Sequence, residues 1–160
     1  GYTVSRIVIV PNIVTAFASQ YLLDNIDYVQ TEAIDITGAK SNVTAKVGLI
    51  SDDGVRLDIQ DQINVVVMIE KEATRTFDNV QVKLTNSNTA YRYVLSQEVV
   101  SVTVQGPASA VEQLAANNIS VEADVAGLES GSRSIKLTYN IAGTCYVQSI
   151  RPSSVTVIVQ

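Results

Sequence analysis

Apolar and polar residues alternate along most of this 160-residue chain. In residues 119–125 (ISVEADV), for example, every second side chain is apolar. Successive side chains of a strand point to opposite faces, so this period predicts strands that bury one face and expose the other. The same period recurs in residues 43–50, 55–59, 77–84, 134–141 and 154–160, and residues 64–70 are more continuously apolar. We therefore predict a mainly β chain of antiparallel strands.

Two segments break this period and predict short helices. Residues 11–25 place Ile13, Phe17 and Tyr21 four residues apart, on one helical face. Residues 107–118 begin with a proline, which a first helical position accepts. Each segment directly follows an alternating strand, and an apolar helical face of this kind is typical of packing over a sheet.

The order of these predicted elements occurs twice, roughly 90 residues apart. A strand, a short helix, a strand that ends in Asp-x-x-Gly and two further strands follow one another in each half. The Asp-x-x-Gly steps are residues 35–38 and 124–127, and Ile59 in the first half corresponds to Ile150 in the second. We predict two tandem modules, residues 1–73 and residues 74–160, in which each aspartate forms an Asx-turn that holds the glycine.

Gly106-Pro107 lies between a strand and a helix, where a phosphate-binding loop could begin. The chain has no Gly-x-x-x-x-Gly-Lys-Ser/Thr pattern, and Pro107 removes a backbone donor that a phosphate would need. We predict a structural corner between strand and helix.

The charge distribution is uneven and disfavours nucleic acid. The formal net charge is −5; residues 1–73 carry five Lys/Arg against ten Asp/Glu, and residues 74–160 carry six against six. An acidic chain repels nucleic acid and anionic membrane surfaces. Residues 90–94 (AYRYV) could form a stacking platform, but we interpret them as covering a sheet edge, because the two tyrosines share one face of a strand.

The common catalytic arrangements are missing. The sequence has no histidine and one cysteine, Cys145, so it lacks a disulfide framework and the commonest general base, and we predict that Cys145 is an ordinary core or strand residue. Asp52, Asp53, Asp58 and Asp61 form the densest acidic group, but Asp53-Gly54 favours a turn over a weak surface calcium site. We predict no catalytic, cofactor-binding or metal-binding residue, and no enzyme.

Three sequence features together resemble the YbbR-like domain. They are the valine alternation into Gly106-Pro107, the Asp-Val-Ala-Gly step at 124–127, and Pro-Ser-Ser-Val-Thr-Val at 152–157. The resemblance implies β-rich modules of bent, crossing strands in tandem, with residues 74–160 as a complete repeat and residues 1–73 as a repeat that lacks its first strands. The first repeat departs from this pattern at two places. It has Val-Pro-Asn at 10–12 in place of Gly-Pro, and Asp61-Gln62 in place of the closing proline.

Proteins with YbbR-like domains that are similar to this chain carry an N-terminal transmembrane helix. Several of them regulate a membrane diadenylate cyclase that makes cyclic di-AMP. The resemblance therefore implies a non-enzymatic, extracytoplasmic regulatory region of a membrane-anchored bacterial protein, with the cyclase as partner. The anchor is expected outside residues 1–160, because no apolar run here reaches the ~18 residues of a membrane span. We expect no nucleic-acid partner and no direct membrane contact within these residues.

One alternative stays open at the level of sequence. A cell-envelope module could bind a wall component or another ligand independently of any cyclase, and it should then show an apolar pocket with converging polar groups. Residues 134–141 and 154–160 are also predicted to be edge strands that could pair between chains.

Overall fold

The computed structural model describes residues 1–58 and 62–160, and these form two compact units. One unit is residues 2–70, and the other is residues 71–160 together with Gly1. Strands dominate both units and two short α-helices occur, so the predicted fold class is confirmed. The predictions that involve Ile59 and Asp61 lie outside the described residues.

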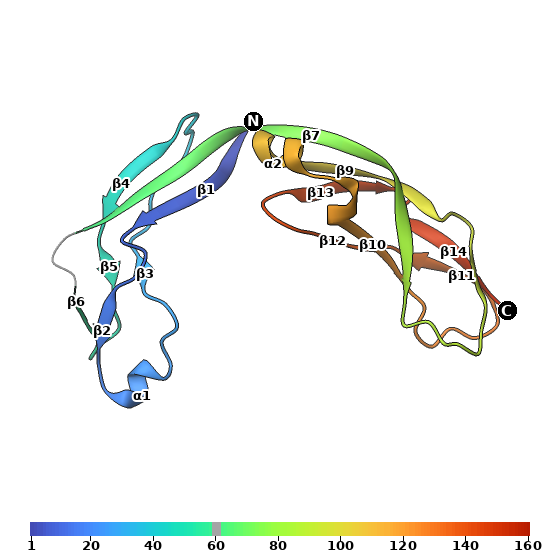
Figure 1. Cartoon of the computed structure of the whole chain (residues 1–160), viewed down its shortest axis with the longest axis horizontal. Helices are drawn as coiled ribbons and strands as arrows, with labels where there is room; N and C mark the ends of the chain where they lie inside the picture. The colour runs from blue at the N-terminus through green and yellow to red at the C-terminus, as the bar shows by residue number, and fades with distance from the viewer. Residues whose placement is uncertain (59–61) are drawn as a thin grey trace. The chain divides into compact units, whose positions relative to one another are not determined.

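In the unit of residues 2–70, the described residues form three small sheets. In the first, two strands pair with the start of β7 (Ile63–Thr85), one on each side (Figure 1): β1 (Tyr2–Val10) and β4 (Val43–Val47). The other two are antiparallel pairs: β2 (Thr15–Phe17) with β6 (Arg56–Asp58), and β3 (Gln30–Thr31) with β5 (Leu49–Ile50). The only helix described in this unit is α1 (Gln20–Leu23).

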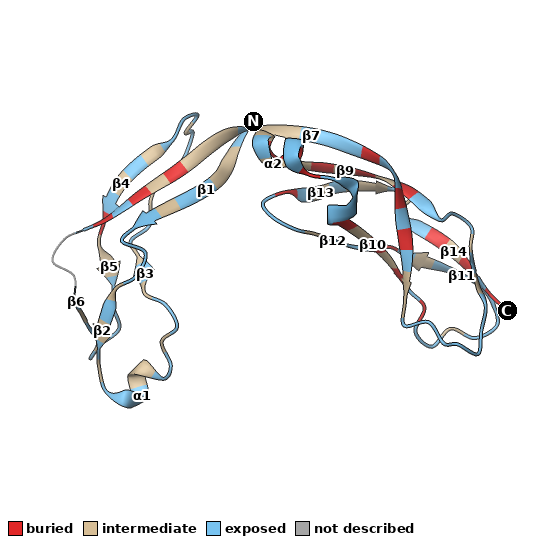
Figure 2. Cartoon of the chain, in the orientation of Figure 1, coloured by how far each residue is buried: buried red, intermediate tan, exposed pale blue. Residues whose placement is uncertain are grey.

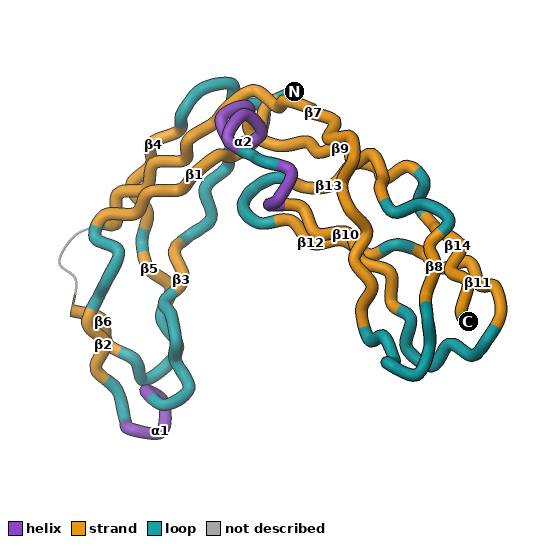
Figure 3. Tube along the Cα trace, turned by 45° about the vertical axis from the view of Figure 1, so that its right-hand side comes forward, coloured by secondary structure: helices purple, strands orange, loops and turns teal. Residues whose placement is uncertain are grey.

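The helix predicted over residues 11–25 is mostly wrong. Only residues 20–23 are helical, and Phe17 ends a strand whose partner is β6. Loops connect these short elements (Figure 3). Ile13 is 81% exposed and Tyr21 is 78% exposed, so these apolar side chains do not pack into a core.

The second unit holds two sheets. The larger one has the order β12-β10-β7-β9-β13, and the smaller one has the order β11-β14-β8. β7 pairs antiparallel with β9 and parallel with β10, so one pairing in this antiparallel fold is parallel. The bounds of the strands are β8 (Tyr93–Leu95), β9 (Val99–Pro107), β10 (Ile119–Asp124), β11 (Gly131–Lys136), β12 (Thr138–Ile141), β13 (Tyr146–Arg151) and β14 (Ser154–Val159).

Gly106-Pro107 forms the predicted corner between a strand and a helix. β9 ends at Pro107 and α2 (Ala108–Gln113) begins at the next residue. The helix is shorter than the predicted residues 107–118, because a 3₁₀ turn (Ala116–Asn118) follows it. Val111 and Leu114 are buried, and Nη1 of Arg75 on β7 donates a hydrogen bond to the Leu114 carbonyl oxygen at 3.2 Å, which holds the end of the helix.

Residues 134–141 do not form one strand, and residues 154–160 do not form an edge. The first segment divides at Leu137 into β11 and β12, which belong to different sheets. β14 lies between β11 and β8, so its two sides are already paired, and the prediction of an edge strand there is wrong.

The two units differ strongly in core size (Figure 2). The second unit buries fifteen apolar residues in one cluster, and Val102, Val104, Val121 and Val157 are 0% exposed. These residues come from alternate positions of the strands, as the sequence period predicts. The cluster of the first unit has four buried residues: Val47, Ile63, Val65 and Val67. The hydrophobic stabilisation available to the first unit is correspondingly smaller.

Candidate interaction surface

The two Asp-x-x-Gly steps form the predicted Asx-turns. The backbone N–H of Thr37 donates to Oδ1 of Asp35 at 2.9 Å, and the N–H of Ala126 donates to Oδ1 of Asp124 at 3.0 Å. Gly38 and Gly127 follow with φ of 71° and 66°, the left-handed region that glycine adopts without strain.

Hydrogen bonds to these two carboxylates lower their pKa values. The pKa of Asp35 lies below its ordinary value because the Thr37 side chain and then its backbone N–H donate to it. The pKa of Asp124 is lowered first by the side chain of Asn86, whose Nδ2 donates at 2.9 Å, and then by Ala126. Both carboxylates are exposed acceptors engaged in turns, which is a structural role.

The acidic group around Asp53 also forms a turn. The N–H of Val55 donates to the carbonyl oxygen of Asp52 at 3.0 Å, and Gly54 has φ of 85°, so the predicted turn is confirmed. It is not a hairpin, because β5 and β6 on either side pair with other strands. Within residues 1–58 and 62–160, no three Cys, Asp or Glu side chains gather as a metal site.

Cys145 is buried just before β13, as predicted. Burial raises the pKa of its thiol, because desolvation disfavours the thiolate. A protonated thiol is a poor nucleophile, so Cys145 acts as a small apolar side chain.

A polar hollow of about 620 Å³ lies on the solvent face of the second unit, and sequence reasoning missed it. Oγ of Ser101 donates to Oδ1 of Asp78 at 2.6 Å, and the Thr76 and Thr103 hydroxyls lie 3.0 Å apart. Thr76 and Thr103 are directly opposite on β7 and β9, so these contacts join neighbouring strands. No lysine lines the hollow and the chain has no histidine, so the proton acceptor of the Ser101 hydroxyl is the Asp78 carboxylate, a much weaker base than either.

The tyrosines of residues 90–94 lie at a sheet edge, as predicted. β8 is the outer strand of its sheet, and the backbones of Arg92 and Gln160 exchange hydrogen bonds of 2.8 and 2.9 Å. The Tyr93 hydroxyl accepts the N–H of Asn88 at 3.1 Å. The ring is thus tied to its own loop, which is not the arrangement of a free stacking platform.

The feature that distinguishes the first unit is its exposed apolar surface. Besides Ile13 and Tyr21, the exposed residues include Tyr28 at 73%, Ile7 at 56% and Ile50 at 53%. Large exposed apolar areas on a small protein typically mark interaction sites.

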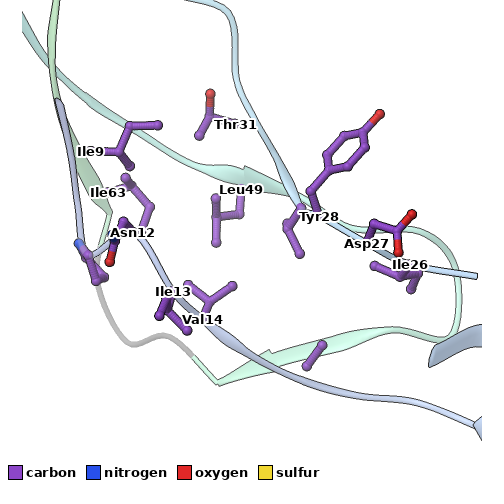
Figure 4. Close-up of a pocket in the computed structure, with 13 residues that line it drawn as sticks. Ile9, Asn12, Ile13, Val14, Ile26, Asp27, Tyr28, Thr31, Leu49 and Ile63 are labelled. Carbon is purple, nitrogen blue, oxygen red and sulfur yellow. The ribbon is translucent and has the colours of Figure 1, made fainter. Parts of the chain in front are cut away.

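One hollow in this surface, of about 380 Å³, is lined by Ile9, Ile13, Leu49, Ile63 and their neighbours. Figure 4 shows its apolar side chains gathered around Leu49, with Asn12 and the Asp27 carboxylate at opposite ends and the Tyr28 hydroxyl pointing away. A site for a small polar ligand requires polar groups that converge on one point, and the polar groups of this hollow do not. The hollow fits apolar side chains of a partner better.

A second hollow of about 320 Å³ lies beside it, and we call it the β1 groove. Its walls are β1, with Ile7 and Ile9, and residues 31–36, and its floor includes Val65 and Val67 of β7. Glu32 is its only charged lining residue, and Oε2 of this side chain accepts the N–H of Gly48 at 3.0 Å. The groove is therefore mainly an apolar surface.

Comparison with known proteins identifies the family. A sequence model described as YbbR-like protein matches residues 1–67 and 79–159. The chain belongs to the YbbR-like family. It is similar to the CdaA regulatory protein CdaR of Bacillus subtilis, with 24% identity over 143 residues. The match covers 88% of this chain but 30% of that relative, so the chain spans less than a third of its length.

Two solved structures of the family are also similar. The YbbR-like domain of a Listeria monocytogenes protein is 29% identical, with a TM-score of 0.50 over 55% of this chain and 93% of that one. A YbbR-like protein from Streptococcus pneumoniae is 21% identical, with a TM-score of 0.46 over 56% of this chain and 47% of that one. Among the described residues of this YbbR-like chain, no helix has the length and apolarity to cross a bilayer.

Proposed function

We propose that this chain is a non-enzymatic regulatory region of a membrane-anchored bacterial protein, on the extracytoplasmic face of the membrane, and that it modulates a membrane diadenylate cyclase. The observation that carries this proposal is the match of 88% of the chain to a protein named as a regulator of CdaA. A regulator of this kind acts through the partner surface that it contacts. It needs no catalytic group of its own.

The proposal includes two YbbR-like repeats, residues 1–73 and residues 74–160. The family match falls in both halves, and both contain the same Asx-turn. The strands around the turns also correspond: β3 pairs with β5 as β10 pairs with β12, and β4 pairs with β7 as β11 pairs with β14.

The first unit supplies the surface that best fits a protein partner. Its apolar hollows lie in a unit with four Lys/Arg against nine Asp/Glu, net −5, while the second unit has seven against seven. An apolar centre within a charged surface is the usual composition of a protein interface. The contact with the cyclase is therefore proposed for residues 2–70.

The experiment measures cyclic di-AMP in cells that express the full-length parent protein. The comparison versions are a deletion of residues 1–160 that keeps the membrane anchor, and the variant Ile13→Asp. Ile13 lines a hollow and is 81% exposed, so its substitution should leave the fold intact. We expect both changes to alter the cyclic di-AMP level in the same direction.

The matched control is Tyr139→Asp, which replaces an exposed apolar residue of the second unit. It should leave the level unchanged. A level that stays the same after deletion of residues 1–160 would contradict the regulatory role. A change that follows deletion and Tyr139→Asp but not Ile13→Asp would move the contact to the second unit.

A further inference from the structure

The polar hollow of the second unit has a floor built from three neighbouring strands. Its side chains form two rows across β7, β9 and β13, with Thr76, Thr103 and Ser149 in one row and Asp78, Ser101 and Arg151 in the other. Val102 lies between the rows on β9 and is 0% exposed, because alternate side chains of a strand point to opposite faces. The same strands therefore carry a buried apolar core on one face and a continuous polar surface on the other.

Both outer strands of this floor carry a β-bulge at the hollow. The register of β7 against β9 shifts at Asp78 and Asn79, where Asn79 has φ of 62°, and the register of β13 against β9 shifts at Gln148. A bulge bends its strand and re-aims the side chains beside it, and bulges are frequent next to functional sites. Two bends on opposite sides of β9 account for a hollow where a regular sheet face would be flat.

The two sides of the hollow have opposite hydrogen-bonding capacity. On the β7 side, the Ser101 hydroxyl donates to Oδ1 of Asp78 at 2.6 Å, which leaves Oδ2 of Asp78 and the lone pairs of Ser101 as acceptors. On the β13 side, Arg151 offers only donors, and the Gln148 amide offers donors and an acceptor. Among the residues that the structure describes, none gives the side chain of Gln148 or Arg151 a hydrogen bond or an ion pair. Acceptors and donors thus face the same space from opposite sides.

The charges of the hollow select a neutral ligand. Asp78 repels an anion and Arg151 repels a cation, and these are the only charged residues of its lining. A ligand that meets both sides must donate hydrogen bonds to the first and accept them from the second. A hydroxyl group does both without a charge, so several hydroxyl groups on one molecule match this lining.

An exposed aromatic ring lies beside the hollow on the same face. Tyr146 is opposite Gln105, two residues along β9 from Thr103, so the three side chains share the solvent face. The Tyr146 side chain is 48% exposed. A tyrosine ring offers an apolar face next to a polar hydroxyl, and the C–H face of a sugar ring packs on such a surface while its hydroxyl groups point to the side.

We propose that the polar hollow on β7, β9 and β13 binds a neutral oligosaccharide. Oδ2 of Asp78 accepts from the sugar hydroxyl groups, the Arg151 guanidinium and the Gln148 amide donate to them, and a neighbouring sugar ring packs on Tyr146. The volume of about 620 Å³ lies within the range of small-molecule sites. This binding function goes beyond the proposed regulation of a cyclase and does not rest on it, because it needs only the second unit.

The experiment titrates the ¹⁵N-labelled 160-residue chain with three neutral trisaccharides, maltotriose, cellotriose and chitotriose, and follows the amide chemical shifts. We expect at least one of them to cause saturable shifts at residues 76–78, 101–103 and 146–151, with a Kd of about 1–10 mM. Inorganic phosphate and triglycine are the comparison ligands, an anion and a zwitterion. They should bind at least about tenfold more weakly than that sugar.

Two pairs of variants test the location. Tyr146→Ser removes the ring beside the hollow, and Tyr139→Ser removes a ring of similar exposure, 52% against 48%, from β12 of the same unit. Arg151→Gln removes the guanidinium of the hollow, and Arg133→Gln removes another exposed one on β11. All four changes are at exposed positions and should preserve the fold, as circular dichroism would check. The first member of each pair should weaken sugar binding at least about fivefold, and the second should leave it unchanged.

Three outcomes would overturn the proposal. The first is that none of the three sugars causes saturable shifts up to about 50 mM. The second is that phosphate or triglycine shifts the same amides with an equal or lower Kd, because the site would then select a charge and not hydroxyl groups. The third is sugar binding that is equal in Tyr146→Ser and Tyr139→Ser and in Arg151→Gln and Arg133→Gln, because the sugar would then bind elsewhere.

Discussion

A Cβ atom on Gly106 would lie 3.0 Å from both the Cα and the Sγ atoms of Cys145. Real side chains do not approach a backbone carbon so closely without displacing it. Gly106 is therefore required because β9 passes directly against the residue that precedes β13. The glycine that resembles the start of a phosphate loop in the sequence serves close packing between two strands.

The first prediction concerns this close approach. Gly106→Ala should lower the free energy of unfolding by about 1–3 kcal/mol, the usual cost of overpacking a core. Urea denaturation measures the loss. In the Cys145→Ala background the loss should shrink but not vanish, because the sulfur atom is removed while the backbone of residue 145 still lies against the new methyl group. Equal stability of Gly106→Ala and the wild type would mean that the strands separate freely.

The second prediction concerns the Asx-turn at Asp124. The native pKa of this carboxyl lies below its ordinary value, so the unfolded state binds the proton more tightly. Its contribution to stability is present above the unfolded pKa near 3.8 and is lost as the pH falls through the lower native pKa. Asp124→Asn should flatten the loss of stability in acid, as thermal melts from pH 5 down to pH 2 would show. A pH profile of stability that is the same in Asp124→Asn and the wild type would contradict the stabilising role of the Asp124 carboxylate.

The third prediction is that a core substitution in one unit destabilises that unit and not the other. Val65→Ala and Val157→Ala remove the same two methyl groups from buried strand positions, one in each unit. Each should cost about 2 kcal/mol at its own site. Site-resolved amide exchange should show the first change in β4, next to Val65, and the second in β11, next to Val157. Equal acceleration of exchange in both strands by each variant would show that the units open together.

The fourth prediction concerns the thiol. Cys145 should react with a thiol reagent at pH 8 far more slowly in the folded chain than in urea, because burial both blocks access and raises its pKa. The absorbance of the released thiolate measures both rates. A native rate close to that in urea would show that β13 opens readily.

The structural features that depend only on nearby residues could be predicted from the sequence. The Asx-turns at Asp35 and Asp124 follow from residues four positions apart or fewer, and the alternation of Val102 and Val104 follows from strand geometry. These features need no knowledge of which strands become neighbours.

The errors arise where a distant partner decides the structure. Phe17 has helical spacing to Ile13 and Tyr21, but it pairs with Arg56 on β6, whose guanidinium carbon lies 4.6 Å from the ring centroid. Leu137 continues an alternating run, but its N–H donates to the Ser153 carbonyl oxygen at 3.0 Å and the chain changes sheet there. The β1 groove was invisible for the same reason, because only the fold brings β1, residues 31–36 and the start of β7 together.

The continuity of β7 has a consequence for how this family can vary. The boundary between the two units falls between Glu70 and Lys71, inside a strand that runs without a loop from Ile63 to Thr85. β4 pairs with residues 63–67 of this strand, whereas β9 and β10 pair with residues 72–85, so an insertion between Glu70 and Lys71 would leave Phe77, Val80 and Val82 on their own partners. Changes of length at this boundary should therefore spare both cores, although the two units share one unbroken strand.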